Sequence, residues 1–279
     1  MATVRALLDD ARVRLAENFQ PRREAALLLG RLLGRSEAWL LAHDDHTVPA
    51  EVATHFEQWL TRRLAGEPVA YLFGEREFFG RPFRVDPRVL IPRPETEHLI
   101  ETVLALDVPA DARVLDIGVG SGAIAATLSL ERPGWRVFGS DLSLAALVVA
   151  QTNGRLLGAS VELAAGDLTA PWCLAMFDLV VSNPPYVQAG DRTPELRFEP
   201  ALALVADDHP AGPAVAVYAR LLAELGGAGG LRAGTPVVLE IGWNQQPALE
   251  RLAEETGFDA VSTVIDYAGH PRTMVFLRR

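Results

Sequence analysis

Apolar side chains recur at helical spacing through the first part of the chain. One set falls on a single helical face, at Val4, Leu7, Leu8, Ala11 and Leu15. Pro21 stands where a second helix can begin, and Gly34 stands where that helix can end. Ser36 is placed to cap a short third helix, and another apolar helical run follows Pro49. No strand pattern interrupts these runs, so the sequence predicts a small all-helical domain over residues 1–73.

The pattern changes between residues 74 and 93. Glycine and proline there punctuate short aromatic and β-branched runs, such as Phe78-Phe79 and Phe83-Arg84-Val85. This punctuation is typical of turns between short strands. We therefore expect a hairpin linker over residues 74–93.

From residue 94 to residue 279, short apolar runs alternate with helical patterns. The runs expected as strands are apolar throughout, which is typical of strands covered on both faces. Strands separated by helices predict an α/β domain with a doubly wound, mostly parallel sheet. The expected helices cover residues 95–106, 123–130, 144–157, 215–225 and 246–256, and the expected strands cover residues 113–117, 136–140, 161–164, 178–182, 236–241, 261–265 and 273–277.

Composition narrows the functional class. The chain has 26 basic and 36 acidic residues, a net charge of −10 and a pI near 5.1. Because phosphate contacts require a basic face, this balance disfavours direct nucleic-acid binding. The single cysteine, Cys173, fits a reducing compartment, and no basic partner marks it as reactive. No apolar run approaches the ~20 residues that span a bilayer, and the first ten residues lack the apolar core of a signal peptide, so we expect a cytoplasmic protein that contacts no membrane. No exposed apolar repeat suggests an oligomer, so we expect a monomer.

A glycine loop joins the strand expected over residues 113–117 to the following helix. Its glycines are Gly118, Gly120 and Gly122. Glycine lets the backbone turn sharply and lets a ligand approach without a Cβ in the way. The helix that follows offers N–H groups at its first turn. For the loop alone, an ordinary strand–helix turn is an open alternative.

Acidic residues at the strand ends help to identify the ligand of this loop. Asp141 ends the next expected strand, where a carboxylate can accept both hydroxyls of a ribose. Its alternative role is the N-cap of the next helix. These features also suit a nicotinamide dinucleotide. Asp116 before the loop, and Asp167 where an acid can meet an adenine amine, favour S-adenosylmethionine, although Asp167 fits a simple turn equally well.

The strand expected over residues 178–182 runs directly into Asn183-Pro184-Pro185-Tyr186. Ligands of open α/β sheets bind beyond the carboxyl ends of the strands, so this segment falls at the expected site. Both prolines lack an N–H and have a fixed φ, and the residue before a proline is held extended. The loop is therefore stiff, and its carbonyl oxygens can accept hydrogen bonds.

The hydrogen-bonding groups of this loop indicate its target. A primary amide or an exocyclic amine carries two N–H donors on a planar nitrogen. The side-chain oxygen of Asn183 can accept one proton, and the carbonyl oxygen of Pro184 can accept the other. Tyr186 can stack on the planar group and lie near the sulfonium. Orientation is then the main catalytic device, so we expect neither a metal ion nor a dedicated base.

Together these segments resemble the peptide chain release factor glutamine methyltransferases, within the Rossmann-like S-adenosylmethionine-dependent methyltransferases. The resemblance covers nearly the whole chain. Pro92-Arg93-Pro94-Glu95 is more specific to that family than the glycine loop is. The matching segments are residues 68–74, 90–97, 115–125, 181–186, 197–202 and 239–242, with Asp141 and Asn153.

The resemblance implies a helical substrate-recognition domain, a hairpin linker and a seven-stranded catalytic domain. It implies methylation of the glutamine side-chain amide nitrogen in the Gly-Gly-Gln loop of class-1 release factors, which modulates translation termination. By position, Asn183, Pro184, Pro185 and Tyr186 are then the residues that hold this glutamine. The cofactor-lining residues are Gly118, Gly120, Gly122, Asp141, Leu168 and Asn183.

The chain departs from the family pattern at three places. Val119 stands where the family often has threonine, and Leu168 stands where an aromatic residue can occur. Residues 269–272 match the acid-plus-arginine ending of the family only loosely, so the sequence assigns them no role. Arg93 fits either a site residue or a structural ion pair.

Other interpretations remain open at this stage. An adenine exocyclic-amine methyltransferase acting on DNA or RNA can use the same four-residue loop, but it must also flip the base and hold the backbone. A module that binds S-adenosylmethionine without turnover is a second alternative. Residues 43–46 carry two histidines and two aspartates, and we expect a solvated loop there rather than a metal site.

Overall fold

The computed structural model describes residues 2–16, 20–191, 193–266 and 268–279. The chain divides into two compact units, Met1–Gly74 and Glu75–Arg279. Among the described residues, no helix combines the length and apolar character needed to cross a membrane.

The first unit is helical, as the sequence predicts. Gly34 ends the second helix in the left-handed conformation, at φ 63°, and the Ser36 hydroxyl caps the third by accepting a hydrogen bond from the Trp39 N–H. A separate hydrophobic core, which includes Phe56 and Leu60, holds the helices together. Its described helices are α1 (Val4–Arg14), α2 (Pro21–Leu33), α3 (Glu37–Ala42), α4 (Ala50–Leu64) and α5 (Val69–Phe73).

The second unit begins with the hairpin expected from the sequence. Strands β1 (Glu75–Phe78) and β2 (Arg81–Arg84) pair antiparallel. Phe78 and Phe83 meet edge to face, and both are buried against the helices of this unit. The hairpin therefore packs as part of the second unit, and its role as a linker stays a prediction.

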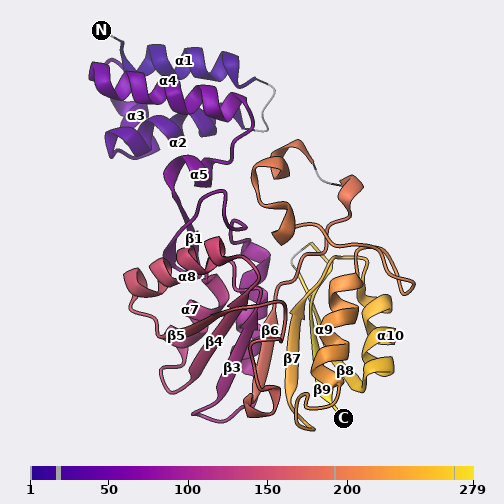
Figure 1. The fold of residues 1–279 in the computed structure, drawn as a ribbon. Coiled ribbons are helices and arrows are strands. Elements are labelled where there is room, and N and C mark those ends of the chain that lie inside the picture. Colours follow the sequence, from indigo (N-terminus) through magenta and orange to yellow (C-terminus); the bar gives the residue numbers. More distant parts are fainter. Residues whose placement is uncertain (1, 17–19, 192, 267) are drawn as a thin grey trace. The chain divides into compact units, whose positions relative to one another are not determined.

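A seven-stranded sheet forms the centre of the second unit (Figure 1). The strand order is β5-β4-β3-β6-β7-β9-β8, and β9 runs antiparallel to both of its neighbours while the other pairs are parallel. The fold class predicted from the sequence is thus confirmed. The strands are β3 (Arg113–Ile117), β4 (Arg136–Asp141), β5 (Val161–Ala165), β6 (Leu179–Ser182), β7 (Pro236–Glu240), β8 (Phe258–Ile265) and β9 (Pro271–Arg278).

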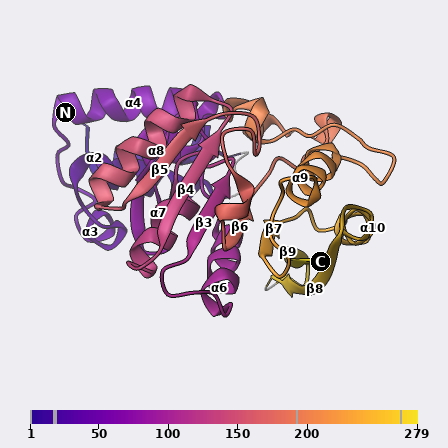
Figure 2. The same ribbon diagram turned by 60° about the horizontal axis from the view of Figure 1, so that its bottom comes forward.

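Helices cover both faces of this sheet (Figure 2). Successive strand residues point to opposite faces, so Val114 joins one buried cluster and Leu115 joins the other. The first cluster contains side chains of α6 (Glu97–Ala105), α7 (Ala123–Glu131) and α8 (Leu144–Leu157). The second contains those of α9 (Ala216–Gly226) and α10 (Gln246–Thr256). The short 3-10 helices are η1 (Pro94–Thr96), η2 (Leu174–Met176), η3 (Ala189–Asp191), η4 (Pro194–Phe198) and η5 (Ala201–Ala203).

Candidate active site

Two loops leave neighbouring strands at the centre of the sheet. Ile117 of β3 and Ser182 of β6 lie opposite each other in the parallel register. The Ser182 hydroxyl also donates a hydrogen bond of 2.6 Å to the Ile117 carbonyl oxygen. Gly118 and Asn183 therefore begin side by side. The chain continues from β3 to β4 on one side and from β6 to β7 on the other, which is the point where open α/β sheets bind ligands.

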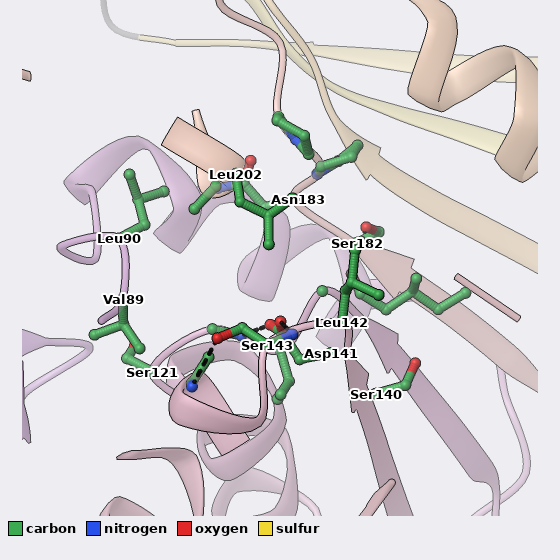
Figure 3. A pocket seen from close by; sticks show the side chains of 18 of the residues that line it. Val89, Leu90, Ser121, Ser140, Asp141, Leu142, Ser143, Ser182, Asn183 and Leu202 are labelled. Carbon is green, nitrogen blue, oxygen red and sulfur yellow. Dashed lines mark hydrogen bonds between the residues drawn. The ribbon is translucent and has the colours of Figure 1, made fainter. Parts of the chain in front are cut away.

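A cavity of about 260 Å³ opens beside these loops. Figure 3 shows Val89 and Leu90 on one side of it, with Asp141 and Asn183 reaching toward it from strand ends. Gly122 does not line this cavity. The residues predicted from the sequence that do line it are Gly118, Gly120, Asp141, Asp167, Leu168, Asn183, Pro184 and Pro185.

Asp141 organises the side of the cavity next to the glycine loop. One carboxylate oxygen accepts a hydrogen bond from the Gly120 N–H at 2.9 Å, and the other accepts one from the Ser143 N–H at 2.8 Å. The N-cap of α8 is Ser143, whose hydroxyl accepts from the Ala146 N–H. Each Asp141 oxygen keeps a further lone pair, so the carboxylate can still accept the two hydroxyls of a ribose.

The glycine loop satisfies its own N–H groups. The N–H groups of Gly118 and Val119 both donate to the Ser140 carbonyl oxygen, at 2.8 and 2.9 Å, and that of Gly120 donates to Asp141. A dinucleotide pyrophosphate needs such N–H groups and would meet the Asp141 charge. A Cβ on Gly118 would touch nothing within 4 Å, so the loop leaves room for a ligand beside its backbone. This arrangement fits S-adenosylmethionine, which carries no phosphate.

Gly122 serves close packing instead of lining the cavity. It caps α7 with φ 82°, and a Cβ there would lie 3.2 Å from the Cα and Cβ of Ala150 in α8. Only glycine combines this φ with so close an approach. The third glycine of the loop therefore lets α7 and α8 approach each other.

Asp167 and Leu168 lie at another part of the cavity wall. The Asp167 carboxylate pairs with the Arg220 guanidinium at 2.8 Å, and both residues line the cavity. Leu168 has φ 47°, an uncommon conformation for a residue with a side chain, and its carbonyl oxygen accepts from the Ser140 hydroxyl. The backbone after β5 is thereby turned toward the cavity.

Asp116 supports the glycine loop from within the core. Its side chain is fully buried, and one oxygen accepts a hydrogen bond of 3.1 Å from the Ala125 N–H in the first turn of α7. Burial, with a smaller contribution from the charge of Asp141, raises the pKa of Asp116 to about 7. The other oxygen has no hydrogen-bond partner among the described residues.

A second cavity, of about 190 Å³, adjoins the first. Tyr186 lines this second cavity and does not line the first. The residues common to both cavities are Leu90, Arg93, Asn183, Pro184, Pro185 and Ala203. The loop predicted to hold the methyl acceptor thus stands between two spaces of ligand size.

Partly buried hydrogen bonds hold the loop at both ends. The Asn183 side-chain nitrogen donates to the Thr96 hydroxyl oxygen at 3.2 Å. At the other end, the Tyr186 hydroxyl donates to the Glu240 carboxylate at 3.1 Å, and the Tyr186 carbonyl oxygen accepts from the Gln245 side chain at 3.4 Å. The loop is therefore held by side chains as well as by its prolines.

Glu240 is fully buried at the end of β7. Burial raises the pKa of its carboxyl to about 7, although interactions with Thr96, Tyr186 and Arg272 lower it. The same burial, with the adjacent Glu240 charge, raises the pKa of Tyr186 far above its usual range. Tyr186 therefore stays protonated and acts as a hydrogen-bond donor.

Comparisons with known proteins agree with this geometry. The family described as the PrmC N-terminal domain matches residues 6–74, and the methyltransferase small domain matches residues 95–199. A release factor glutamine methyltransferase of Bordetella pertussis is 44% identical over 92% of this chain and 95% of its own. The chain belongs to the release factor glutamine methyltransferase family. Proteins of the same name are 41% identical in Moorella thermoacetica, over 99% of both chains, and 35% identical in Escherichia coli, over 95% of both.

Membership makes the chain an S-adenosylmethionine-dependent methyltransferase. Solved structures agree on the fold: a methyltransferase from Pyrococcus furiosus superposes with a TM-score of 0.52 and 18% identity, covering 80% of this chain and 98% of its own. A Pyrococcus abyssi tRNA methyltransferase superposes with a TM-score of 0.50 and 14% identity, over 73% of this chain and 43% of its own.

Arg93 lies at the site and also forms an ion pair, which are the two roles that the sequence left open for it. Its guanidinium pairs with Glu199 at 2.5 Å, and it lines both cavities. The second Glu199 oxygen accepts from the Ile91 N–H at 2.9 Å. Glu199 thereby ties the segment ahead of α6 to the region that follows residues 183–186.

Residues 269–272, which match the family pattern only loosely, are held by hydrogen bonds to the Asp266 carboxylate. That carboxylate pairs with Arg272 at 2.8 Å and accepts from the Ala268 and His270 N–H groups, each at 2.9 Å. The His270 and Arg272 bonds lower the pKa of Asp266 to about 2. The charge of Arg272 in turn acts on Tyr186 and Glu240. In the sequence, only the spacing of Asp266 and Arg272 at the turn of a hairpin indicates that these two residues pair.

Thr96, Gln245 and Glu240 also belong to the site, although the sequence analysis assigned none of them a role. Each lies far along the chain from Asn183. Thr96 and Glu240 fall in segments that match the family, but those matches give them no function, and nothing in the local sequence of Gln245 sets it apart. Among the described residues, moreover, no group of three metal-ligating side chains is found, at residues 43–46 or elsewhere.

Proposed function

We propose that this enzyme transfers a methyl group from S-adenosylmethionine to the side-chain amide nitrogen of the glutamine in the Gly-Gly-Gln loop of class-1 peptide chain release factors. The observation that carries the proposal is the meeting of two cavities at Asn183, Pro184 and Pro185. One cavity suits the methyl donor, and the other leads to the loop that can hold the acceptor. The relatives named release factor glutamine methyltransferase support the choice of a protein glutamine.

The acceptor nitrogen is held by two oxygens in this proposal. The Asn183 side chain commits its nitrogen to Thr96, which leaves its oxygen to accept one amide proton. The Pro184 carbonyl oxygen accepts the second. S-adenosylmethionine supplies a methyl carbon bound to a sulfonium, so the donor needs no further activation. A nitrogen–carbon bond forms as the carbon–sulfur bond breaks, and one amide proton leaves to solvent.

Tyr186 has a second task in the proposal. Its hydroxyl is anchored on Glu240, so the ring cannot swing away from the second cavity. An anchored ring can stack on the planar amide and present its face to positive charge. Orientation by these groups can lower a barrier by up to about 7–11 kcal/mol.

The helical unit takes part through recognition of the release factor. We propose residues 1–73 as the substrate-recognition domain, 74–93 as its linker and 94–279 as the catalytic domain. Because release factors work on ribosomes, the proposal also implies a cytoplasmic enzyme. We propose Gly118, Gly120, Gly122, Asp141, Asp167 and Leu168 as cofactor residues, with Gly122 acting through helix packing.

The test incubates the purified protein with methyl-labelled S-adenosylmethionine and a class-1 release factor. We expect label on the release factor, and none when the glutamine of its Gly-Gly-Gln loop is replaced by alanine. A parallel incubation supplies DNA or RNA in place of the protein. Label on an adenine amine, with none on the release factor, would overturn the proposal.

A further inference from the structure

The side-chain amide of a glutamine has three polar positions, namely two N–H donors and one carbonyl oxygen. In the proposed function, the oxygens of Asn183 and Pro184 accept the two N–H donors. The loop has no free side-chain donor for the carbonyl oxygen, because the Asn183 nitrogen and the Tyr186 hydroxyl are both directed to other side chains. A side-chain partner for that oxygen therefore has to come from outside residues 183–186.

Arg93 is the remaining side chain with N–H donors at the second cavity. Among the described residues, three that line this cavity carry an N–H or O–H group on the side chain: Arg93, Asn183 and Tyr186. Arg93 also lines the first cavity, so it stands with Asn183 and Pro184 where the two cavities adjoin. Burial raises the pKa of Tyr186 and the charge of Arg93 acts against it, which places the guanidinium near that hydroxyl.

Glu199 fixes the guanidinium at this junction. One oxygen of its buried carboxylate accepts from the Ile91 N–H at 2.9 Å, and the other accepts from Nη2 of Arg93 at 2.5 Å. The negative charge offsets that of Arg93, so the pair repels a sulfonium less than an unpaired guanidinium would. Nε and Nη1 of Arg93 form no hydrogen bond with any residue that the structure describes, so both can still donate to a ligand.

We propose that Arg93 donates a hydrogen bond to the carbonyl oxygen of the acceptor amide and so holds the third polar position of the group that is methylated. The inference rests on the proposed function, because it concerns the acceptor of the same reaction. With two oxygens on its N–H groups and a guanidinium on its oxygen, the amide has a fixed plane. One face of its nitrogen is left open to the methyl carbon.

The same contact contributes to specificity for the chemical class of acceptor. A side-chain amine has no carbonyl oxygen and gains nothing from Arg93. A side-chain carboxylate can bind the guanidinium, but it has no N–H groups for the oxygens of Asn183 and Pro184. A primary amide satisfies all three groups at once.

The first experiment is a double-mutant cycle across the interface between enzyme and substrate. Calorimetry measures the affinity of a class-1 release factor for the enzyme with bound S-adenosylhomocysteine. The enzymes are wild type and Arg93→Met, and the release factors have the loop glutamine intact or replaced by alanine. We expect Arg93→Met to weaken binding of the intact release factor about 10- to 100-fold, the range for hydrogen bonds to a charged group, and binding of the alanine release factor less than about twofold.

Arg81→Met is the matched control. Arg81 also forms an ion pair with a carboxylate, that of Glu131, and its side chain is about as exposed as that of Arg93, but it lines neither cavity. Both release factors should bind this variant within about twofold of wild type. A purely structural role of Arg93 would weaken both release factors alike, so a difference between them reports contact with the glutamine.

The second experiment separates the charge of the guanidinium from its shape. Arg93→Lys keeps a positive charge beside Glu199, but lysine has one nitrogen in place of the planar fork that can bond two partners. At saturating S-adenosylmethionine, we expect a kcat for release-factor methylation about tenfold below wild type and a raised KM for the release factor. Affinity for S-adenosylhomocysteine should stay within about twofold. Full activity of Arg93→Lys would overturn the proposed contact, because charge alone would then suffice.

The results keep two failures apart. If the wild-type enzyme methylates no release factor, the proposed function is wrong. If it does, but Arg93→Met weakens both release factors by the same factor, the contact between Arg93 and the glutamine is wrong. Should Arg93→Met fail to fold, the cycle is run with Arg93→Lys, for which equal losses have the same meaning.

Discussion

The two halves of the site are built by different means. The half proposed for the cofactor, called the cofactor half, draws mainly on the stretch 116–168 and on backbone groups: three glycines with positive φ, a shared carbonyl oxygen and one carboxylate. The acceptor half uses side chains from separate segments, namely Thr96, Asn183, Tyr186, Glu240, Gln245 and Arg272. The first half should therefore be sensitive to added volume, and the second to the loss of single polar groups.

The sharpest contrast between the halves is expected at Asn183. Asn183→Ala removes the oxygen proposed to hold the substrate amide, so turnover should fall about 10²–10³-fold. Affinity for S-adenosylhomocysteine should change only a few-fold, because the Asp141 contacts remain. Single-turnover methylation and calorimetry measure the two effects. An equal loss of both would assign Asn183 to the cofactor half.

Asp141 provides the reciprocal test. Asp141→Ala removes the anchor of the Gly120 N–H and the proposed ribose acceptor. Loss of charged hydrogen bonds of about 1.5–3 kcal/mol corresponds to cofactor affinity weakened roughly 10- to 100-fold. Turnover at saturating cofactor should stay near wild type. Asp44→Ala, which removes an exposed carboxylate of the first unit, is the control, and the comparison fails if both variants bind cofactor equally well.

Gly122 tests the sensitivity of the cofactor half to added volume. Gly122→Ala combines an unfavourable φ with a Cβ 3.2 Å from Ala150, so unfolding free energy should drop by about 2–3 kcal/mol. Gly158→Ala is the matched variant: its φ is 72°, but its Cβ would meet nothing within 4 Å, so about 1 kcal/mol is expected. Urea unfolding gives both values. Equal losses would mean that helix contact is irrelevant.

A further prediction concerns the pH dependence of stability, which reports on the buried Asp116 beneath the glycine loop. The folded protein keeps a proton on Asp116 up to about pH 7, whereas the unfolded chain releases it near pH 4. The unfolded state therefore binds fewer protons between these values, and stability falls as pH rises through this window. Asp116 contributes at most about 1.4 kcal/mol per pH unit.

Urea titrations of the wild type and of Asp116→Asn from pH 5 to pH 8 measure this slope. The asparagine does not titrate, so its curve should be flatter between pH 5 and pH 7, whatever its absolute stability. Asp266, with a pKa near 2, changes stability only at lower pH and does not interfere. Parallel slopes in the two proteins would assign the proton to another group.

The difference between the two halves also explains which parts of the structure could be predicted from the sequence. Features that depend on local patterns were predicted. Residues 113–117 and 144–157 were expected as a strand and a helix, and the structure has both within the same bounds. The fold class and the cavity around Asp141 and Asn183 depend on such local patterns. Asp141 as the cap of α8 was an open alternative, and Ser143 takes that place because its hydroxyl reaches the Ala146 N–H.

The acceptor half was mostly beyond local reasoning. Thr96, Glu240 and Arg272 meet only because their strands and helices pack together, and no spacing within one segment announces such a meeting. Arg272 illustrates this, since the ending it belongs to was assigned no role from sequence. A positive φ at Leu168 is equally invisible in a residue type that rarely adopts it.

The position of β9 has a consequence for how the enzyme forms during synthesis. β9 lies between β7 and β8 in the sheet, although it follows both in the chain. While residues 271–278 are still unmade, β7 has no neighbour on that side, and Glu240 at its end faces an incomplete core. The cofactor loop precedes these residues by more than a hundred positions. During translation, the acceptor half should therefore be the last part of the site to assemble.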